Sequence, residues 1–494
     1  MADEQDQLAR VHSLYLDTLH GDARAIFAHA LEASRIERVF QDRIGCEGTT
    51  LFVKPPPEMG TERPPAPFEL GGYRKILVIA LGKAAVPMAE SLLGILPRKM
   101  RVRGICSAPA RPDQRDWRIR YYAGGHPLPN RDSFRAAQHA LRLLRRASEN
   151  TFVIYLISGG GSTLFDLPLD PDISLADTIS FHESLITSGA TIAEINTLRK
   201  HFSAVKGGRL ATAAPRSEKL VLQVADVPLR HADALASGPV VPDPSTVEDC
   251  RELLDRYRLL EKFPPSVCRF FSSPDLPETP ADKAALKERA ERVDAAQKAG
   301  FKSFSFLTAN TQPAGVPSQI VTLLSNHELL LAAQDKAAAL GYEVAVDNGC
   351  DDWPYEEAVA YLVDRFIELR GQHPGRKLCL LSGGEVTVRI DRKPGRGGRN
   401  QQFALACALL LQERLAGEAA VCLSAGSDGA DGNSPAAGAI ADTTTVTRAR
   451  TLGFSPEAAL AAFDACPLFT ALRDTIVTGP TGNNLRDLRI VLSL

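Results

Sequence analysis

The sequence predicts an α/β protein with two domains, each built on a mostly parallel sheet flanked by helices. In both halves of the 494-residue chain, short apolar runs alternate with segments of helical periodicity. This pattern is typical of strands that are buried on both faces of a parallel sheet. Two of the runs end in glycine-rich turns, Ser158–Ser162 and Ser382–Glu385. Open α/β sheets bind ligands at such strand-to-turn junctions, so we expect two α/β halves that share one anionic ligand.

The composition is that of an ordinary globular protein, with 44% hydrophobic and 23% charged residues. A net charge of −2 argues against a nucleic-acid partner, because nucleic-acid-binding domains are normally clearly basic. No stretch approaches the ~18 consecutive apolar residues of a membrane span, and the acidic N-terminus lacks the apolar core of a secretory signal. The nine cysteines are scattered without a CxxC pair, which predicts reduced thiols in a cytoplasmic protein.

The first half is expected to begin with one or two helices over residues 8–44, packed on the first domain. A proline-rich surface loop follows at residues 54–68. The apolar run Lys75–Leu81 predicts a buried strand, and Gly82 opens a helix that reaches about Leu96. Further strands are predicted at 104–107, 118–122, 152–157 and 219–224, with helices over 131–148 and 174–213.

The second half resumes this rhythm after a proline-rich segment at residues 262–282 and a charged helix at about 281–299. The proline-rich segment is expected to be the link between the domains or an insertion near it. These features divide the chain into domains of residues 1–280 and 281–494. Strands are predicted at 320–324, 342–346, 378–381, 420–424 and 487–492, with helices over 327–340, 355–370 and 400–412.

A basic, glycine-rich turn, Gly395–Asn400, is the most distinctive segment of the second half. Glycines let backbone N–H groups approach a ligand, and successive amides in a tight turn form a concavity that binds anions. Arg396 and Arg399 add forked cationic donors suited to phosphate or carboxylate. In the first half, Lys83 follows a buried strand and a single glycine at the start of a helix, where an anion is favoured. A solvated first-turn lysine is the alternative interpretation of Lys83.

The segment Asn196–Arg209 is predicted to be a helix with a strongly basic face. Asn196 and Lys200 fall on one side of it, and Lys206 lies further along the same face. Gly207-Gly208 would weaken a helix, so we expect these glycines to permit a close approach of the backbone. The segment is a candidate for binding an anion, and a solvated cationic face is the alternative.

Asp226 and Asp428 each follow a predicted strand, where a carboxylate is well placed to hold Mg²⁺ or to accept the proton of a substrate hydroxyl. Turn chemistry is the alternative, because Asp-Gly sequences are common in tight turns. A last glycine-rich turn, Thr478–Asn484, offers hydroxyl and amide donors for a polar substrate, among them Thr481.

The standard phosphate-binding signatures are missing from the sequence. It contains neither GxxxxGK[ST] nor the HRD and DFG motifs of protein kinases. It also lacks a GxGxxG after a strand, which weakens a dinucleotide-binding interpretation. The glycine-rich turns, the basic helix and the aspartates remain as candidate sites.

Taken together, these segments resemble the glycerate 2-kinase family, whose C-terminal half carries the MOFRL domain. The resemblance covers roughly residues 20–250 and 318–494. It rests on motifs that are weak singly and specific in family order: GKAA at 82–85, ISGGGS at 157–162, INTLRK at 195–200 with KGGRL at 206–210, ASGP at 236–239, LSGGE at 381–385, GGRNQ at 397–401, AGSDG at 425–429 and TGPTG at 478–482.

The resemblance implies ATP-dependent phosphorylation of D-glycerate at its 2-hydroxyl, giving 2-phosphoglycerate, with Mg²⁺. It also implies a Rossmann-like α/β domain and a MOFRL-containing domain, with the active site in the cleft between them. Lys83 and Arg399 match the family's essential lysine and cleft arginine, and Asp226 is the third expected catalytic residue. Asp226 and Asp428 are the candidate ligands for Mg²⁺. In the loop at 225–233 the family usually carries Ser-Asp-Val followed by Gly-Asp; this chain reads ADVPLRHAD, which keeps Asp226 but loses the glycine.

The other residues expected to bind substrate or nucleotide lie in the turns and the basic helix: Ser158, Gly159, Gly160, Gly161, Ser162, Asn196, Lys200, Lys206, Ser382, Gly383, Gly384, Glu385, Gly397, Gly398, Asn400, Gln401, Asp428 and Thr481. Which turn binds ATP and which binds D-glycerate stays open, as does the identity of the base. The oligomeric state also stays open, with a homodimer as one option.

Two other functions compete with this one. A dinucleotide-dependent oxidoreductase acting on a small hydroxy acid would need an acidic ribose-binding residue about twenty residues past a GxGxxG, and no such pair is evident. A non-enzymatic protein that senses a sugar phosphate would need fewer distinct polar turns than this chain carries.

Overall fold

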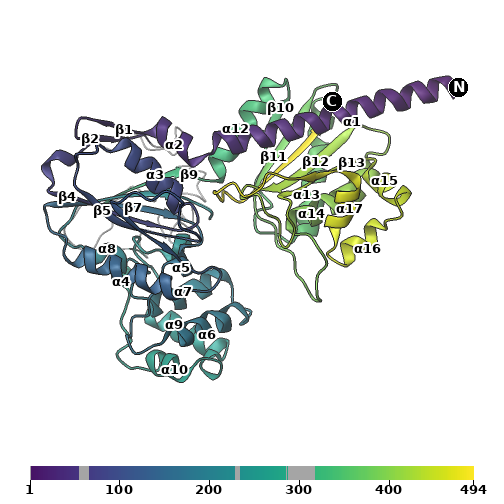
Figure 1. Cartoon of the computed structure of the whole chain (residues 1–494). Helices are drawn as coiled ribbons and strands as arrows, with labels where there is room; N and C mark the ends of the chain where they lie inside the picture. Colours follow the sequence, from purple (N-terminus) through teal and green to yellow (C-terminus); the bar gives the residue numbers. More distant parts are fainter. Residues whose placement is uncertain (1, 55–65, 228–233, 285, 287–317) are drawn as a thin grey trace. The chain divides into compact units, whose positions relative to one another are not determined.

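The computed structural model describes residues 2–54, 66–227, 234–284, 286 and 318–494, and it divides into two compact units (Figure 1). The central unit is Ile36–Leu323, and the terminal unit combines Met1–Arg35 with Leu324–Leu494. The α/β fold class predicted from the sequence is confirmed. The observed units differ from the expected division at residue 280, because both ends of the chain contribute to the terminal unit.

Helix α1 (Ala2–Ala33) accounts for this difference at the N-terminal end. Its buried residues recur at three- and four-residue intervals, from Leu16 and Leu19 to Ile26 and Phe27, and this face packs on α12 (Asn326–Ala339) and on strands of the terminal unit. Burial of an apolar stripe decides where an amphipathic helix docks. The expectation that residues 8–44 pack together on the first domain was therefore wrong for α1, while α2 (Ile36–Arg43) does lie in the central unit.

The central unit is built on a six-stranded sheet of order β6-β5-β4-β7-β8-β9. All pairings from β6 through β8 are parallel, and β4, β7 and β8 are almost entirely buried, as their continuous apolar runs predict. The strands are β4 (Lys75–Leu81), β5 (Val102–Ala108), β6 (Ile119–Ala123), β7 (Thr151–Ser158), β8 (Lys219–Val224) and β9 (Ser318–Leu324). A small antiparallel sheet comprises β1 (Ile44–Glu47), β2 (Thr50–Val53) and β3 (Phe68–Glu69).

Helices cover this sheet and form a separate aromatic cluster. The helices are α3 (Ala85–Ile95), α4 (Arg131–Arg145), α5 (Gly161–Leu164), α6 (Leu175–Ile186), α7 (Ile192–Phe202), α8 (Arg209–Thr212), α9 (Val247–Arg256) and α10 (Pro265–Phe271). Phe181 and Phe202 stack with ring centroids 4.1 Å apart, and Phe263 and Phe271 pack around them. Residues 262–282 were expected to link the domains or to form an insertion near the link. Buried phenylalanines hold the first part of this segment inside the central unit, which argues against a link there and leaves the insertion.

The terminal unit has a six-stranded sheet of order β10-β11-β15-β12-β13-β14. Only β10 and β11 pair in parallel, because the last strand, β15, inserts antiparallel between β11 and β12. All seven residues of β15 are buried, which requires a central place in the sheet. The mostly parallel sheet expected here was therefore wrong, and the sheet is mixed. Its strands are β10 (Glu343–Val346), β11 (Leu378–Gly384), β12 (Ala420–Gly426), β13 (Gly438–Asp442), β14 (Thr475–Ile476) and β15 (Asp487–Ser493).

The remaining helices of the terminal unit are α13 (Tyr355–Gln372), α14 (Arg399–Arg414), α15 (Thr445–Thr451), α16 (Pro456–Ala461) and α17 (Ala465–Leu472). Helix α14 contributes to both apolar clusters of this unit through Phe403 and Leu405. Within the described ranges, no helix combines the length and apolar character that a membrane span requires. Most of the proline-rich loop at 54–68 and of the charged helix predicted at 281–299 lies outside the described residues.

Candidate functional site

The carboxyl edge of the central unit's sheet brings two of the predicted turns together. Strands β4 and β7 pair in parallel, with Leu81 opposite Ile157. The strand order reverses between them, since the chain continues from β4 to β5 on one side and returns to β7 on the other. Such switch points are the usual ligand sites of open α/β sheets. The turns that follow β4 and β7 are those that carry Lys83 and Ser158–Ser162.

Hydrogen bonds lock these two turns to each other. The backbone N–H of Lys83 donates to the carbonyl of Gly159 at 2.8 Å. The buried hydroxyl of Ser158 accepts from the N–H of Ala84 at 3.0 Å and lies 3.5 Å from the carbonyl oxygen of Leu81. Ser158 therefore positions the Lys83 turn, and its hydroxyl is already used within the protein.

The glycines of the Ser158–Ser162 turn are explained by its backbone conformation and by the side chains that pack against it. Gly160 has φ of 77°, a left-handed conformation that favours glycine. A Cβ at this position would lie 3.1 Å from Cγ of Lys83, so the Lys83 side chain runs over bare backbone. A Cβ on Gly159 would overlap the carboxylate of Asp226. The structure thus brings both Lys83 and Asp226 to this turn.

The same edge holds an arginine that lies in the INTLRK motif at 195–200 but was not predicted as a site residue. Arg199, on α7, is only 8% exposed, its Nε is buried without a partner, and its guanidinium has no acceptor among the described residues. Burial lowers the pKa of this guanidinium, and the carboxylate of Asp166 only partly opposes the shift. Buried polar groups almost always have a partner, so an exception of this kind needs an explanation.

His126 lies close enough to both Lys83 and Arg199 for the charge of each to affect it. Burial lowers the pKa of His126, and the positive charges of Lys83 and Arg199 lower it further. Its Nδ1 lies 3.2 Å from the hydroxyl of Thr163, just past the glycine turn. The Lys83 ammonium, like the Arg199 guanidinium, has no acceptor in the part of the chain that the structure describes. The edge therefore carries two cations without acceptors beside a neutral imidazole.

A chain of side-chain hydrogen bonds continues from the glycine turn to α7. The hydroxyls of Ser162 and Ser237 lie 2.8 Å apart, and Ser237 donates to Oδ1 of Asn196 at 3.0 Å. Ser237 has φ of 59°. The loop that carries it rests on the predicted glycine pair, where the N–H of Gly208 donates to the carbonyl of Gly238 at 2.8 Å. These glycines do permit the close backbone approach that the sequence predicted.

The other predicted cations of the basic segment are already paired with acids. Lys206 is buried against Asp166, which also lies 2.7 Å from Nε2 of His182. Although burial opposes the shift, Lys206 and His182 hold the pKa of the Asp166 carboxyl below its usual value. Lys200 is buried too and pairs with Asp243 at 3.2 Å. The predicted helix over 196–209 is interrupted, because α7 ends at Phe202 and α8 begins at Arg209. Neither lysine is solvated: Lys200 holds α7 through Asp243, and Lys206 holds the segment after α7 through Asp166.

In the terminal unit, Arg399 is clamped by two acids where β11 and β12 end and β15 begins. Its Nε and Nη2 donate to the two oxygens of Asp487 at 2.6 and 3.0 Å, and Nη2 also lies 2.7 Å from Glu385. Asp487 is fully buried, and although burial opposes the shift, its charge raises the pKa of the Arg399 guanidinium. With 36% of the Arg399 side chain exposed, the guanidinium is both oriented and accessible.

Several amides of the Gly395–Asn400 turn and of the adjoining Gln401 are occupied by side chains of the same unit. Four backbone N–H groups donate to side-chain oxygens at 2.7–2.9 Å: Arg396 to Asp464, Gly397 to Asn433, and Asn400 and Gln401 to Asp431. A Cβ on Gly398 would overlap Asp431. Burial raises the pKa of Asp431 to about 6, although the amides it caps oppose the shift. The side chains of Asn400 and Gln401 are buried, so the arginines are the polar side chains of this segment that remain open to a ligand.

The Ser382–Glu385 turn is held in the same way. The N–H of Gly383 donates to Asn348 at 2.7 Å, and the N–H of Glu385 donates to Asp351 at 3.0 Å. Gly384 has φ of 94°, a left-handed conformation, and Ser382 is buried. The turn held in this way places the Glu385 carboxylate 2.7 Å from Arg399.

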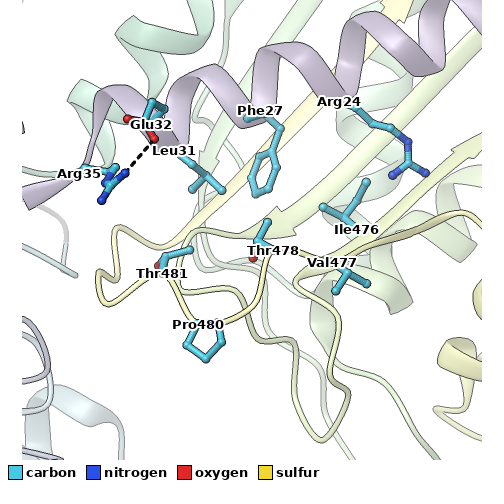
Figure 2. Close-up of a pocket in the computed structure, with 11 residues that line it drawn as sticks. Arg24, Phe27, Leu31, Glu32, Arg35, Ile476, Val477, Thr478, Pro480 and Thr481 are labelled. Atoms are coloured by element: carbon cyan, nitrogen blue, oxygen red, sulfur yellow. Dashed lines mark hydrogen bonds and ion pairs between the residues drawn. The ribbon is translucent and has the colours of Figure 1, made fainter. Parts of the chain in front are cut away.

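The turn at Thr478–Asn484 packs beside Asp428. The carboxylate of Asp428 accepts from the N–H of Ala430 at 3.1 Å, which is the turn chemistry expected of an Asp-Gly sequence. Thr481 donates its hydroxyl to the carbonyl of Ser427 at 2.7 Å. Thr481 also lines a hollow of about 530 Å³ beneath α1, and Figure 2 shows Phe27 pointing towards this turn.

A metal site does not stand out from the protein ligands alone. Among the described residues, no group of three or more His, Cys, Asp and Glu side chains has an arrangement suited to a metal ion. Mg²⁺ is, however, usually held by one or two carboxylates together with phosphate oxygens. Asp226 fits this mode of binding, in which one carboxylate acts together with phosphate oxygens. It lies against the glycine turn, at the same edge as two cations without acceptors.

Comparison with known proteins agrees with this architecture. Residues 22–272 match the domain of unknown function DUF4147, and residues 378–487 match the MOFRL family. The chain is 34% identical over 427 residues to the glycerate 2-kinase of Pyrococcus horikoshii, covering 86% of this chain and 88% of that protein. It is 31% identical over 424 residues to an Agrobacterium vitis protein provisionally named hydroxypyruvate reductase, with coverage of 85% and 87%. The crystal structure of a glycerate kinase from Thermotoga maritima superposes with a TM-score of 0.74 at 29% identity, over 97% of this chain and all of that one.

Proposed function

Since the chain belongs to the glycerate 2-kinase family, we propose that it transfers the γ-phosphoryl group of ATP to the 2-hydroxyl of D-glycerate and releases 2-phosphoglycerate. The observation that carries this proposal is the pair of cations without acceptors at the β4–β7 switch point, Lys83 and Arg199. Both reactants are anions, and the glycerate carboxylate and the ATP phosphates are the groups that such cations recognise.

Arg199 binds the carboxylate of D-glycerate in this proposal. Its guanidinium is almost buried, so only a small anion reaches it, and its planar fork matches the two oxygens of a carboxylate. Asn196 lies three residues earlier on the same helix face, where its amide is placed for the hydroxyl groups of the acceptor. This pairing orients the acceptor, and phosphoryl transfer depends chiefly on orientation and charge stabilisation.

Lys83 faces the group that is transferred. Its ammonium stabilises the negative charge on the phosphoryl oxygens as the bond to the leaving group breaks, and the bare backbone of Gly160 leaves room for its side chain. Mg²⁺, when bound, offsets phosphate charge, and Asp226 is the residue that holds it. Asp226, whose carboxylate lies against Gly159, is also the residue proposed to accept the proton of the 2-hydroxyl.

Arg399 is the second catalytic cation in this proposal. Asp487 and Glu385 fix its guanidinium in one orientation, and a preoriented charge costs no rearrangement during the reaction. The exposed part of its side chain contacts the phosphates. The other residues of this turn act in this proposal by holding Arg399 in place; the amide of Gly397 already donates to Asn433.

A second candidate is a dinucleotide-dependent reductase of hydroxypyruvate, which the provisional name of the Agrobacterium vitis relative favours. The missing GxGxxG after a strand argues against it, because that turn lets the backbone approach a dinucleotide pyrophosphate. A cofactor-dependent change of absorbance at 340 nm with hydroxypyruvate would support the reductase.

The deciding experiment is a coupled ADP-release assay with D-glycerate, L-glycerate and hydroxypyruvate, followed by identification of the phosphoglycerate isomer. We expect ADP release that depends on D-glycerate and yields the 2-isomer. Release without D-glycerate dependence would refute the proposal, and formation of the 3-isomer would refute its choice of hydroxyl.

A further inference from the structure

A cationic cavity lies on the central unit, at the edge strand β6 and helix α4. Its volume is about 410 Å³, within the range of roughly 300–1,000 Å³ usual for small-molecule sites. Four arginines line it: Arg111 after β5, Arg120 on β6, and Arg135 and Arg142 on α4. The last two are seven residues apart and therefore project from the same face of the helix.

The cavity contains one carboxylate for these four guanidiniums. Asp132 pairs with Arg111 and lies 3.6 Å from Arg135. Arg120 lies over the ring of Tyr122 at 5.8 Å, and Nε of Arg142 donates only to a backbone carbonyl, at 3.4 Å. In the described ranges, neither Arg120 nor Arg142 has a carboxylate partner.

The nearby titratable groups do not offset this charge. The hydroxyl of Tyr122 lies 3.0 Å from Nδ1 of His139. Burial lowers the pKa of His139, and Arg142 and Arg120 lower it further, so this imidazole is neutral at neutral pH. Burial raises the pKa of Tyr122 despite the same arginines, so its phenol also stays neutral. The cavity therefore has a surplus of three positive charges.

We propose that this arginine cavity binds a phosphate-bearing small molecule, at a site separate from the turn that carries Lys83. Guanidinium groups bind phosphate through parallel N–H donors, and a concave wall of one charge sign concentrates anions. Arginines on an ordinary solvated surface point away from one another. These four come from three separate segments and line the same cavity. The proposal does not depend on the reaction proposed above.

The test is calorimetric titration with inorganic tripolyphosphate at about 150 mM salt without divalent cations. A Lys83→Met/Arg199→Met background removes the two cations of the first site. In this background we expect one binding event per chain, weakened at least tenfold by adding Arg120→Gln/Arg142→Gln. The matched control is Arg145→Gln/Arg146→Gln, which removes the same charge from exposed positions at the end of the same helix, and it should bind normally.

Four outcomes would overturn the proposal. The first is no binding in the background protein, and the second is unchanged binding after Arg120→Gln/Arg142→Gln. The third is equal weakening by the control pair, which would mean that net charge alone attracts the probe. The fourth is binding of sulfate as tight as that of tripolyphosphate at the same concentration, which would mean that the cavity has no preference for a phosphate-bearing ligand.

Discussion

Replacing Arg199 by methionine should stabilise the ligand-free protein and weaken substrate binding at the same time. Arg199 is 8% exposed and has no acceptor among the described residues, so its charge is desolvated without a compensating partner. An uncompensated buried charge costs several kcal/mol. Because Asp166 offsets part of this cost, we expect Arg199→Met to raise the free energy of unfolding by about 1–3 kcal/mol, or roughly 2–3 °C in Tm per kcal/mol.

The matched control is the neighbouring residue on α7. Lys200 is buried to a similar degree but pairs with Asp243 at 3.2 Å. Lys200→Met should therefore destabilise the protein by about 3 kcal/mol, because it leaves a buried carboxylate without this cation. Two adjacent buried cations on one helix are thus expected to shift Tm in opposite directions, which a general disturbance of α7 would not do.

Thermal unfolding of both variants with and without D-glycerate measures these effects. Wild-type protein should gain stability from D-glycerate, and Arg199→Met should lose most of that gain. In the ADP-release assay, loss of a charge-assisted hydrogen bond worth about 1.5–3 kcal/mol raises KM for D-glycerate about 10- to 150-fold. A Tm for Arg199→Met that falls as far as that of Lys200→Met, with unchanged KM, would refute the assignment of Arg199.

Three further predictions concern the same two edges. Lys83→Ala and Arg399→Ala should each lower kcat by about 10²-fold or more with the protein still folded by circular dichroism, and wild-type turnover would remove that residue from the site. Gly160→Ala should lower the free energy of unfolding by about 1–2 kcal/mol, because φ is 77°, and also lower kcat, because the new Cβ lies 3.1 Å from Cγ of Lys83; unchanged Tm would contradict the strain. The pKa of Asp431 is raised from 3.8 to about 6, so the native state binds the proton more tightly and stability should fall, by up to about 3 kcal/mol, as pH rises from 4 to 6. Denaturant titrations should show a flatter profile for Asp431→Asn, and an unchanged slope would disprove this role.

Much of the fold was predictable because the buried strands are continuous apolar runs. The predicted strands at 75–81 and 219–224 coincide with β4 and β8, since short, mainly apolar runs are typical of strands buried on both faces of a parallel sheet. Long-range pairing was not predictable. Nothing in the sequence of β15 tells that it inserts antiparallel between β11 and β12, because a strand buried on both faces reads alike in either direction. The docking of α1 on a unit formed by the other end of the chain is equally invisible to local patterns.

The candidate functional residues were predictable where glycine turns and backbone conformation determine their positions. Lys83 and Asp226 do lie against the Ser158–Ser162 turn. The partners of the cations were not predictable, because counter-ions come from distant segments. Asp166 and Asp243, which pair with Lys206 and Lys200, have no local signature. For the same reason Arg199, one residue before Lys200, could not be recognised as the cation left without an acceptor.

The two units show why a glycine-rich turn after a strand is not by itself an anion site. In the terminal unit, Asp431, Asp464 and Asp351 accept hydrogen bonds from backbone amides that could otherwise bind a phosphate. Asp487 forms an ion pair with Arg399. An anion that approaches this edge meets carboxylates as well as a guanidinium. We therefore expect the anion to bind well there only if a metal ion accompanies it, or if it gains negative charge in the transition state. Interactions that strengthen only as charge develops raise kcat and leave KM little changed.

The central unit has the opposite balance. Lys83 and Arg199 have no acceptors in the described part of the chain, and Asp226 is the carboxylate against the turn. Such a site attracts anions in the ground state. Arg199→Met should therefore act mainly on KM, whereas substitution of Arg399 should act mainly on kcat. The reverse pattern would mean that the acids around Arg399 release it when the substrate binds.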